Sequence, residues 1–288
     1  MIAQQFCIIG CGEIGQRVAR IGLEHHLGFH AWVKSQASLA QCEAMGLPTQ
    51  CLDLDKVDEV AYLNFGAKSA TILYTVPPPK TGLKDTRLNY FLKNLEPDAI
   101  NKFVLISTTG VYGDCAGAWV DETTMIKPEV DRAKRRANTE QCLQNWADKY
   151  AVPWVVLRVP GIYAKDRLPL KRLNSGAPVI VHAEAAWTNR VHADDLAMAC
   201  YQAMTLPIKN EIINVSDDAP STMTDYFNAV ADYANLPRPP QISLADAQQS
   251  LSAGMLSYAV ESRRVRNDKM KAYLKFPLKY PNLKDGLK

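Results

Sequence analysis

The chain has 288 residues, of which 47% are hydrophobic, and its 33 basic and 30 acidic residues give a formal net charge of +3. This length has room for one large domain, or for a domain with an appended lobe. The charges are spread along the chain without a basic block, so nucleic acid is not an expected partner. The apolar runs fall well short of the roughly 20 residues of a membrane helix, and no signal peptide or anchor is readable.

The seven cysteines are scattered, and none forms a CxxC pair or a metal-ligand spacing with the five histidines. Such a pattern is typical of reduced thiols, most of them buried filler, in a cytoplasmic protein. The sequence therefore predicts a cytoplasmic protein without a metal site.

Strand-like apolar runs alternate with helix-like segments through the first half of the chain. Strands are expected at 5–10, 28–33, 48–54, 69–76, 102–108 and 153–159, and helices at 13–26, 36–45, 56–63, 85–95 and about 129–149. Apolar runs this continuous are typical of parallel strands that are buried on both faces. The pattern predicts a doubly wound α/β domain with a parallel sheet.

The first strand runs into the segment IIGCGEIGQRVAR, which places Gly10, Gly12 and Gly15 in the pattern G-x-G-x-x-G. Gly10 permits a tight turn, Gly12 lets the backbone approach a pyrophosphate, and Gly15 lets the helix pack closely on the strand. The pattern alone is a weak signal, but its place in the first strand–helix turn strengthens it. We predict that these glycines, with Glu13 and Ile14, bind a dinucleotide, the alternative being a merely structural turn.

The end of the second strand bears on the choice of dinucleotide. A carboxylate about 20 residues after the glycines would bind the ribose 2′-hydroxyl of NAD, but none occurs between Phe29 and Gln41. Lys34 and Ser35 are able to hold a 2′-phosphate by charge and hydrogen bonding. NADP is therefore preferred over NAD, unless Lys34 is only a solvated surface lysine.

Two further strand ends belong to the same expected site. The third strand ends at Asp53 and Leu54, which are placed to approach an adenine edge, although Asp53 is equally able to cap the following helix. The fourth strand ends in TVPPPKTG, where Val76 is an expected cofactor contact.

The later segments VLISTTGVYGD, WVDE, VVLRVPGIY and NRVHADDLA, together with the glycine turn, resemble the extended short-chain dehydrogenase/reductase superfamily. This superfamily includes the NAD-dependent epimerases and dehydratases, and the likeness covers nearly the whole chain. The resemblance implies a dinucleotide-binding Rossmann domain in residues 1–160. It implies a smaller C-terminal substrate lobe in most of residues 161–288, with some segments returning to the Rossmann domain.

The resemblance also implies roles for single residues. The family's serine or threonine three residues before the valine of VYG assists the substrate oxygen, and this position is Thr108. Thr109 and Tyr112 of the same segment are expected substrate contacts, with structural packing as the alternative for Tyr112.

The segment EVDRAKRRANTEQ departs from the family. There a tyrosine usually moves the proton, and a lysine four residues later on the same helix face lowers the pKa of that tyrosine. When the register is anchored on Glu140, these two positions are Arg132 and Arg136. Guanidinium groups stay protonated at ordinary pH, so neither arginine is able to carry the proton. The chain therefore resembles the atypical branch of the family, whose members often lack the tyrosine.

Arg132 and Arg136 share the helix face that the fold would turn toward the nicotinamide end of the site. We expect them to hold a phosphate or carboxylate of the substrate, or the cofactor pyrophosphate, by bidentate hydrogen bonds. The alternative is a solvated basic face. Arg263, Arg264 and Arg266 form a further basic set in the segment that closes over the substrate in the family, and Arg264 of this set is also an expected substrate contact.

Two functions remain open at this point. Retention of Thr108 and of a full lobe favours an NAD(P)-binding oxidoreductase or epimerase-like enzyme that acts on a small anionic or sugar-like substrate. Loss of the tyrosine and lysine favours a non-catalytic NADP-binding sensor or regulatory protein. The expected partner is a small-molecule substrate, with no nucleic acid and no membrane. A homodimer through the helices expected at 85–95 and 129–149 is an open alternative to a monomer.

Overall fold

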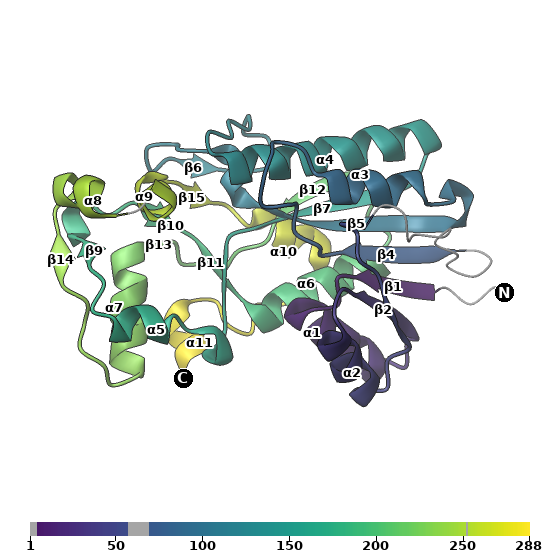
Figure 1. Ribbon diagram of the computed structural model, residues 1–288, viewed down its shortest axis with the longest axis horizontal. Coiled ribbons are helices and arrows are strands. Elements are labelled where there is room, and N and C mark those ends of the chain that lie inside the picture. Colours follow the sequence, from purple (N-terminus) through teal and green to yellow (C-terminus); the bar gives the residue numbers. More distant parts are fainter. Residues whose placement is uncertain (1–4, 57–68, 252) are drawn as a thin grey trace.

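The computed structural model describes residues 5–56, 69–251 and 253–288. One sheet of parallel strands runs in the order β12-β7-β5-β4-β1-β2-β3 (Figure 1). Its strands are β1 (Gln5–Ile9), β2 (Phe29–Val33), β3 (Thr49–Cys51), β4 (Ala70–Tyr74), β5 (Ile100–Thr108), β7 (Trp154–Val159) and β12 (Glu211–Asn214). The order reverses its direction beside β1, and ligands of such sheets bind beyond the carboxyl ends of the strands at that point.

Helices cover both faces of this sheet, which confirms the predicted doubly wound α/β fold (Figure 1). One face carries α1 (Glu13–Glu24), α2 (Gln36–Ala44) and α6 (Ala193–Thr205), and the other carries α3 (Thr86–Lys93) and α4 (Asp131–Tyr150). Every residue of β4 and β7 is buried between these layers, as the continuous apolar runs predicted. Most of the helix expected at 56–63 falls outside the described residues.

A buried carboxylate fixes the helix pair α3 and α4. Asp85 caps α3 by accepting a hydrogen bond from the amide of Leu88 at 3.0 Å, and it accepts another from the hydroxyl of Thr139 on α4 at 2.8 Å. The position of α4 over the sheet is therefore set by a specific polar contact in addition to apolar packing.

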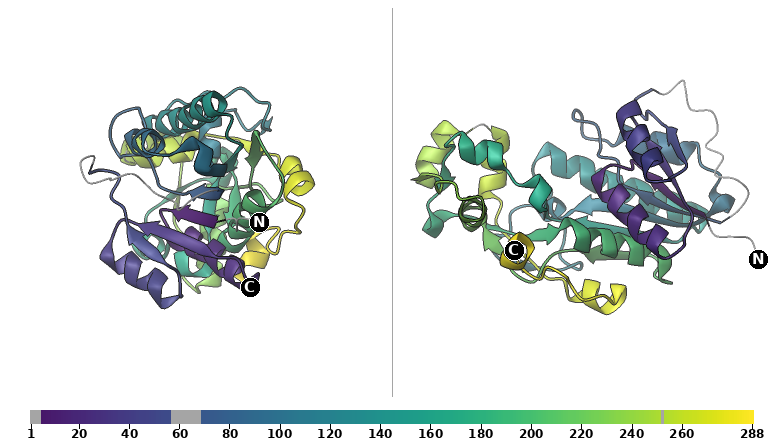
Figure 2. Two further views of the ribbon diagram at one scale, coloured as in Figure 1. Left: turned by 90° about the vertical axis from the view of Figure 1, so that its right-hand side faces the viewer. Right: turned by 90° about the horizontal axis from the view of Figure 1, so that it is seen from below.

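A smaller lobe lies beyond the carboxyl ends of the strands, at the left of Figure 1. Its helices are α5 (Leu170–Asn174), α7 (Met223–Tyr233), α8 (Leu244–Ser250), α9 (Ala253–Val260) and α11 (Leu283–Leu287). Its short strands pair as β9 (Val179–Ile180) with β14 (Gln241–Ile242) and as β10 (Trp187–Thr188) with β13 (Ser221–Thr222). Figure 2 shows in its right view that the lobe forms one end of an elongated molecule and the sheet domain the other.

Several later segments connect the lobe with the sheet domain. β8 (Gly161–Tyr163) pairs with β11 (Arg190–His192), and β6 (Trp119–Val120) pairs with β15 (Arg264–Val265). The remaining elements are α10 (Asp268–Leu274) and the 3-10 turns η1 (Pro97–Ala99), η2 (Thr109–Tyr112), η3 (Lys165–Arg167) and η4 (His182–Glu184). β12 lies within residues 161–288, most of which were expected to form the lobe, but it is the edge strand of the main sheet because it pairs with β7. Within the described ranges, no helix is long and apolar enough to cross a membrane.

Candidate functional site

Two glycines of the turn between β1 and α1 are required by the fold itself. Gly10 has a φ of +85°, and a Cβ at this position would lie 2.7 Å from Cγ2 of Val76. A Cβ on Gly15 would lie 2.9 Å from Cγ2 of Ile8, so helix and strand touch there through the glycine. The tight turn and the close packing that the sequence predicted are both present.

Gly12 differs from its neighbours because protein atoms leave open the space beside its Cα. A Cβ added there would meet only the carbonyl oxygen of Gly10, at 3.8 Å. Gly12 precedes α1 without a side-chain cap, so the first amides of α1, with the positive end of the helix dipole, face this space. The open cradle fits a dinucleotide pyrophosphate, which the amides of Glu13, Ile14 and Gly15 would hold.

A cavity of about 260 Å³ runs from this cradle across the ends of β2, β3 and β4. It brings together most of the residues expected to bind the cofactor: Gly10, Gly12, Lys34, Asp53, Leu54 and Val76. Ser35 stands next to Lys34, but its hydroxyl caps α2 by accepting a hydrogen bond from the amide of Ser38 at 3.2 Å. The cavity has the position of an adenosine site in a Rossmann domain.

Lys34 has acidic neighbours that the second strand alone does not reveal. Its Nζ lies 3.1 Å from Asp53 and 2.7 Å from Asp55. Asp55 also accepts hydrogen bonds from Nε and Nη2 of Arg87, at 2.6 and 2.7 Å. Arg87 and Lys34 together hold the pKa of Asp55 well below its usual range. The second strand has no carboxylate near Lys34, as the sequence showed. The segment after β3, however, brings two carboxylates, Asp53 and Asp55, beside this lysine.

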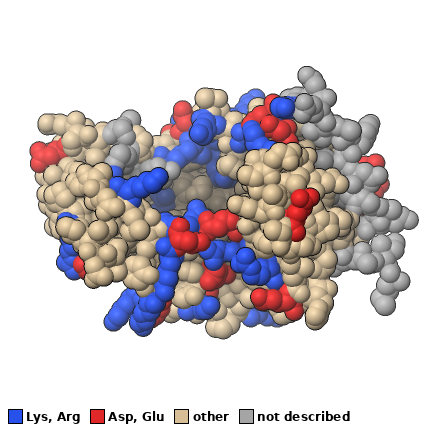
Figure 3. All heavy atoms as spheres, turned by 60° about the horizontal axis from the view of Figure 1, so that its bottom comes forward, with Lys and Arg blue, Asp and Glu red and all other residues tan. Residues whose placement is uncertain are grey.

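A larger pocket of about 480 Å³ opens between the strand ends and the lobe, and it meets the first cavity at Pro77. Figure 3 shows a hollow between the two parts of the molecule, with Lys and Arg side chains at its rim. Cations from four regions of the chain line the pocket: Lys80, Arg132, Arg135, Arg136, Arg190 and Arg263. Among the described residues that line it, Glu261 is the only carboxylate. The charge of this pocket is therefore suited to an anion.

Thr108 and Thr109 both line this pocket, at the carboxyl end of β5. The Thr108 oxygen accepts a hydrogen bond from the amide of Gly110 at 3.1 Å. Because that bond uses a lone pair, the hydroxyl proton of Thr108 stays available for a ligand. The structure thus places Thr108 where it is able to donate to a substrate oxygen.

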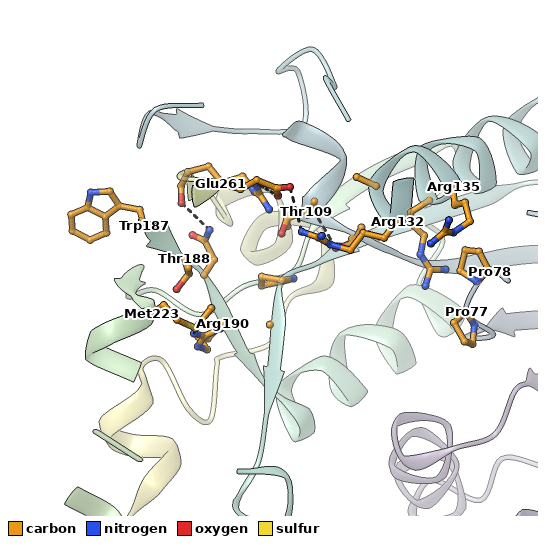
Figure 4. Close-up of a pocket in the computed structure, with 18 of the residues that line it drawn as sticks. Pro77, Pro78, Thr109, Arg132, Arg135, Trp187, Thr188, Arg190, Met223 and Glu261 are labelled. Carbon is orange, nitrogen blue, oxygen red and sulfur yellow. Dashed lines mark hydrogen bonds and ion pairs between the residues drawn. The ribbon is translucent and has the colours of Figure 1, made fainter. Parts of the chain in front are cut away.

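Arg132, Arg136 and Glu140 follow one another at four-residue spacing and therefore lie on one face of α4. This face points toward the sheet and the pocket, as predicted. Glu140 is buried and forms an ion pair of 2.8 Å with Arg158. One turn earlier, Arg136 donates to the carbonyl oxygen of Ile106 at 3.2 Å, and burial lowers its pKa. One turn earlier again, Arg132 donates to Ser257 at 2.6 Å and contacts Glu261 at 3.3 Å (Figure 4).

Tyr112 is a correction to the sequence-based expectation of a substrate contact. Its side chain is 1% exposed, and its hydroxyl donates to Oδ1 of Asn214 at 2.8 Å. Its ring packs under the guanidinium of Arg158, 4.9 Å from the ring centroid. Tyr112 therefore lies in the core, because the η2 turn directs it away from the pocket that Thr108 and Thr109 line.

Arg264 is a second correction. Its guanidinium lies between two indole rings, 5.2 Å from Trp119 and 5.1 Å from Trp187, and its Nε donates to the carbonyl oxygen of Gly117 at 2.8 Å. The neighbouring Arg263 lines the pocket instead. Arg263 precedes β15, and the pairing of β15 with β6 places Arg264 opposite Trp119.

Sequence reasoning missed Arg87, Arg190 and Glu261, which line the two cavities. Arg190 lies within the motif NRVHADDLA, where an arginine in a short apolar strand was a usable signal. Arg87 and Glu261 carry no local signal, because they reach the site from a helix and from the segment that follows α9. The described residues contain no cluster of His, Cys, Asp or Glu that is able to hold a metal ion.

Residues 83–216 match the model of the NAD dependent epimerase/dehydratase family. A dTDP-D-glucose 4,6-dehydratase from Mus musculus is 24% identical over 172 residues, which are 57% of this chain and 48% of that protein. The matched region thus spans about half the length of this curated relative.

Solved structures align with nearly the whole chain. A functionally unknown conserved protein from Silicibacter pomeroyi DSS has a TM-score of 0.84 and 28% identity, over 99% of this chain and 96% of its own. A UDP-glucose 4-epimerase from Thermotoga maritima, solved with UDP-glucose, has a TM-score of 0.79 and 17% identity over the same shares. A dTDP-glucose 4,6-dehydratase from Bacillus anthracis, solved with NAD, has a TM-score of 0.78 and 15% identity, over 99% of this chain and 94% of its own.

Proposed function

This chain belongs to the NAD-dependent epimerase/dehydratase family, and we propose that it is an NADP-dependent oxidoreductase or epimerase-like enzyme for a small anionic, sugar-like substrate. One observation carries the proposal. The cradle for a dinucleotide and a pocket lined by six cations meet at Pro77, with the hydroxyl of Thr108 on the pocket wall. An anionic substrate in the pocket would therefore lie next to the cofactor.

A bound nicotinamide dinucleotide supplies hydride transfer to or from a substrate carbon at this junction. The first amides of α1 would bind its pyrophosphate, and Leu54 and Val76 would contact its adenosine half. Thr108 would donate a hydrogen bond to the substrate oxygen at the reacting carbon. Arg132 and Arg136 would hold an anionic group of the substrate and thereby orient it.

NADP preference is part of the proposal. Lys34 and Arg87 are the cations at the adenosine cavity, and the hydroxyls of Ser35 and Ser38 lie beside them. Lys34 forms ion pairs with Asp53 and Asp55 in the structure. A bound 2′-phosphate would replace these carboxylates as the partner of Lys34.

Lys34→Ala is expected to weaken NADP binding several-fold and to leave NAD binding nearly unchanged, because only NADP has the 2′-phosphate. Fluorescence titration of the reduced cofactors measures both affinities. Equal losses for the two cofactors, or tighter binding of NAD by the parent protein, would instead assign Asp53 and Asp55 to the ribose hydroxyls.

Arg136→Lys is expected to weaken substrate binding about tenfold although the charge is kept, because the bidentate fork is lost. The double variant Arg132→Tyr/Arg136→Lys restores the family's usual pair and should lower the native activity. Lys134→Arg is the matched control, because Lys134 lies on the same helix but is exposed and is not part of the lining of the pocket. Higher turnover in the double variant would show that the arginines are a degraded proton-transfer pair.

The activity itself is tested by adding sugar phosphates, nucleotide sugars and keto acids to the protein with NADPH and following absorbance at the wavelength of the reduced cofactor. Oxidation with at least one of these classes supports an enzyme. Tight NADPH binding without any turnover would favour the sensor function.

A further inference from the structure

Arg190 is a buried cation without an acidic partner in the wall of the larger pocket. It is 7% exposed, and it begins β11 next to Met223 (Figure 4). Its Nη2 lies 3.3 Å from Sδ of Met223, and its Cζ lies 3.9 Å from the ring centroid of Tyr226. Its Nε has no hydrogen-bond partner. Throughout the described ranges, no carboxylate oxygen lies within 4.0 Å of its guanidinium nitrogens.

Arg158 is another buried arginine of this chain, and it does have a carboxylate partner. Arg158 is 3% exposed, and Glu140 accepts hydrogen bonds from its Nε at 3.2 Å and from its Nη2 at 2.8 Å. A guanidinium buried for structural reasons is expected to have such a partner, because an unpaired charge is costly to bury. Arg190 lacks such a carboxylate partner among the residues that the structure describes.

Asp217 is the carboxylate that interacts electrostatically with Arg190, but it does not serve as an ion-pair partner. Burial raises the pKa of Asp217 to about 7, so this carboxyl group is partly protonated near neutrality. The positive charge of Arg190 is therefore incompletely neutralised.

Arg136 is in a similar state at the other side of the pocket. Its hydrogen bond goes to a backbone carbonyl, and no described carboxylate forms an ion pair with it. Arg132 and Arg263, by contrast, both contact Glu261, at 3.3 and 3.1 Å. Arg136 on α4 and Arg190 on β11 thus both face the pocket without an ion pair to a described carboxylate.

We propose that Arg190 binds a second anionic group of the substrate, so that the pocket takes a compound with two separate anionic groups, either phosphates or carboxylates. One group lies against Arg136 and the other against Arg190, with the reacting part of the molecule between them near Thr108. The inference deepens the proposed function and rests on its pocket. It does not require that turnover be observed.

The test compares ligands that differ by one charged group. Fructose 1,6-bisphosphate and fructose 6-phosphate are the phosphate probes, and glutarate and butyrate are the carboxylate probes. The parent protein is expected to bind the member with two anionic groups of at least one pair about tenfold or more tightly than the member with one, measured by calorimetry and by the rise in melting temperature. Arg190→Met should remove this preference and leave NADPH binding unchanged.

Stability separates a ligand-binding role from a structural one. Methionine fits the contacts with Met223 and Tyr226, so Arg190→Met should melt no lower than the parent protein. Arg158→Met is the matched control at a buried arginine that has a partner, and it should melt clearly lower. Equal losses in the two variants would make Arg190 structural and overturn the proposal.

Three binding results would also overturn it. They are the absence of any preference for two anionic groups over one in the parent protein, a preference that survives in Arg190→Met, and an Arg190-dependent response to UDP-glucose alone, whose charges are adjacent. The pair that responds identifies phosphate or carboxylate as the ligand group. These measurements do not use turnover. A negative enzyme assay is therefore distinguishable from a negative result for the binding of two anionic groups.

Discussion

Gly12→Val is expected to abolish dinucleotide binding while the protein stays folded. The added Cβ meets no protein atom closer than 3.8 Å, so the two methyl groups project into the open cradle before α1. Gly12 has φ −81° and ψ −156°, an extended conformation that valine adopts readily. We expect NADPH affinity to fall at least about 100-fold, or roughly 3 kcal/mol. We expect the free energy of unfolding to fall by no more than about 1 kcal/mol.

Gly15→Val is the matched control for this result. Its Cβ would lie 2.9 Å from Ile8 and 3.2 Å from Sγ of Cys11, so this variant should lose about 1 to 3 kcal/mol of stability or fail to fold. Fluorescence titration with NADPH and thermal unfolding followed by circular dichroism distinguish the two effects. A folded Gly12→Val protein with unchanged NADPH affinity would mean that the glycine turn is only structural.

Arg158→Met is expected to destabilise the protein by about 3 to 5 kcal/mol, the usual cost of breaking a buried ion pair from one side. Both side chains of the pair are 4% exposed, so Glu140 would keep its charge in an apolar environment. Among the donors in the described part of the chain, the hydroxyl of Ser107 alone would remain to bind it. Urea denaturation at neutral pH measures the loss.

The double variant Arg158→Met/Glu140→Gln should recover a large part of that stability, because it removes both charges and keeps a group that Ser107 is able to bind. Its free energy of unfolding should exceed that of Arg158→Met by at least about 1 kcal/mol. If the double variant is no more stable than the single one, the loss comes from the packing of Arg158 on Tyr112 and not from the orphaned carboxylate.

The glycine turn and the parallel sheet could be predicted because their signals are local. The φ of +85° at Gly10 and the close contact at Gly15 both arise within one short segment. They require glycine independently of the rest of the chain, so the sequence motif alone reveals them. Strands that are buried on both faces are mostly apolar, so β4 and β7 can be recognised in the sequence as continuous apolar segments. The helix face of Arg132, Arg136 and Glu140 was predictable for a related reason, since residues four apart lie above one another.

The charge balance of the site was not predictable, because it depends on contacts between distant segments. Lys34 looked unopposed along its own strand, yet Asp55 comes beside it from the segment after β3 and Arg87 from α3. Arg132 looked free on its helix, but Glu261 from the end of α9 pairs with it.

The sequence by itself determined the α/β class, the cradle of Gly10, Gly12 and Gly15, and the helix face beside the pocket. Only the tertiary structure decided which cations face a ligand. The two-residue strand β15 has no readable alternation, and its pairing with β6 is what turns Arg264 toward Trp119 and leaves Arg263 at the pocket. Burial and the lack of a carboxylate partner among the described residues, the two properties that distinguish Arg190, arise from packing against residues distant in the chain.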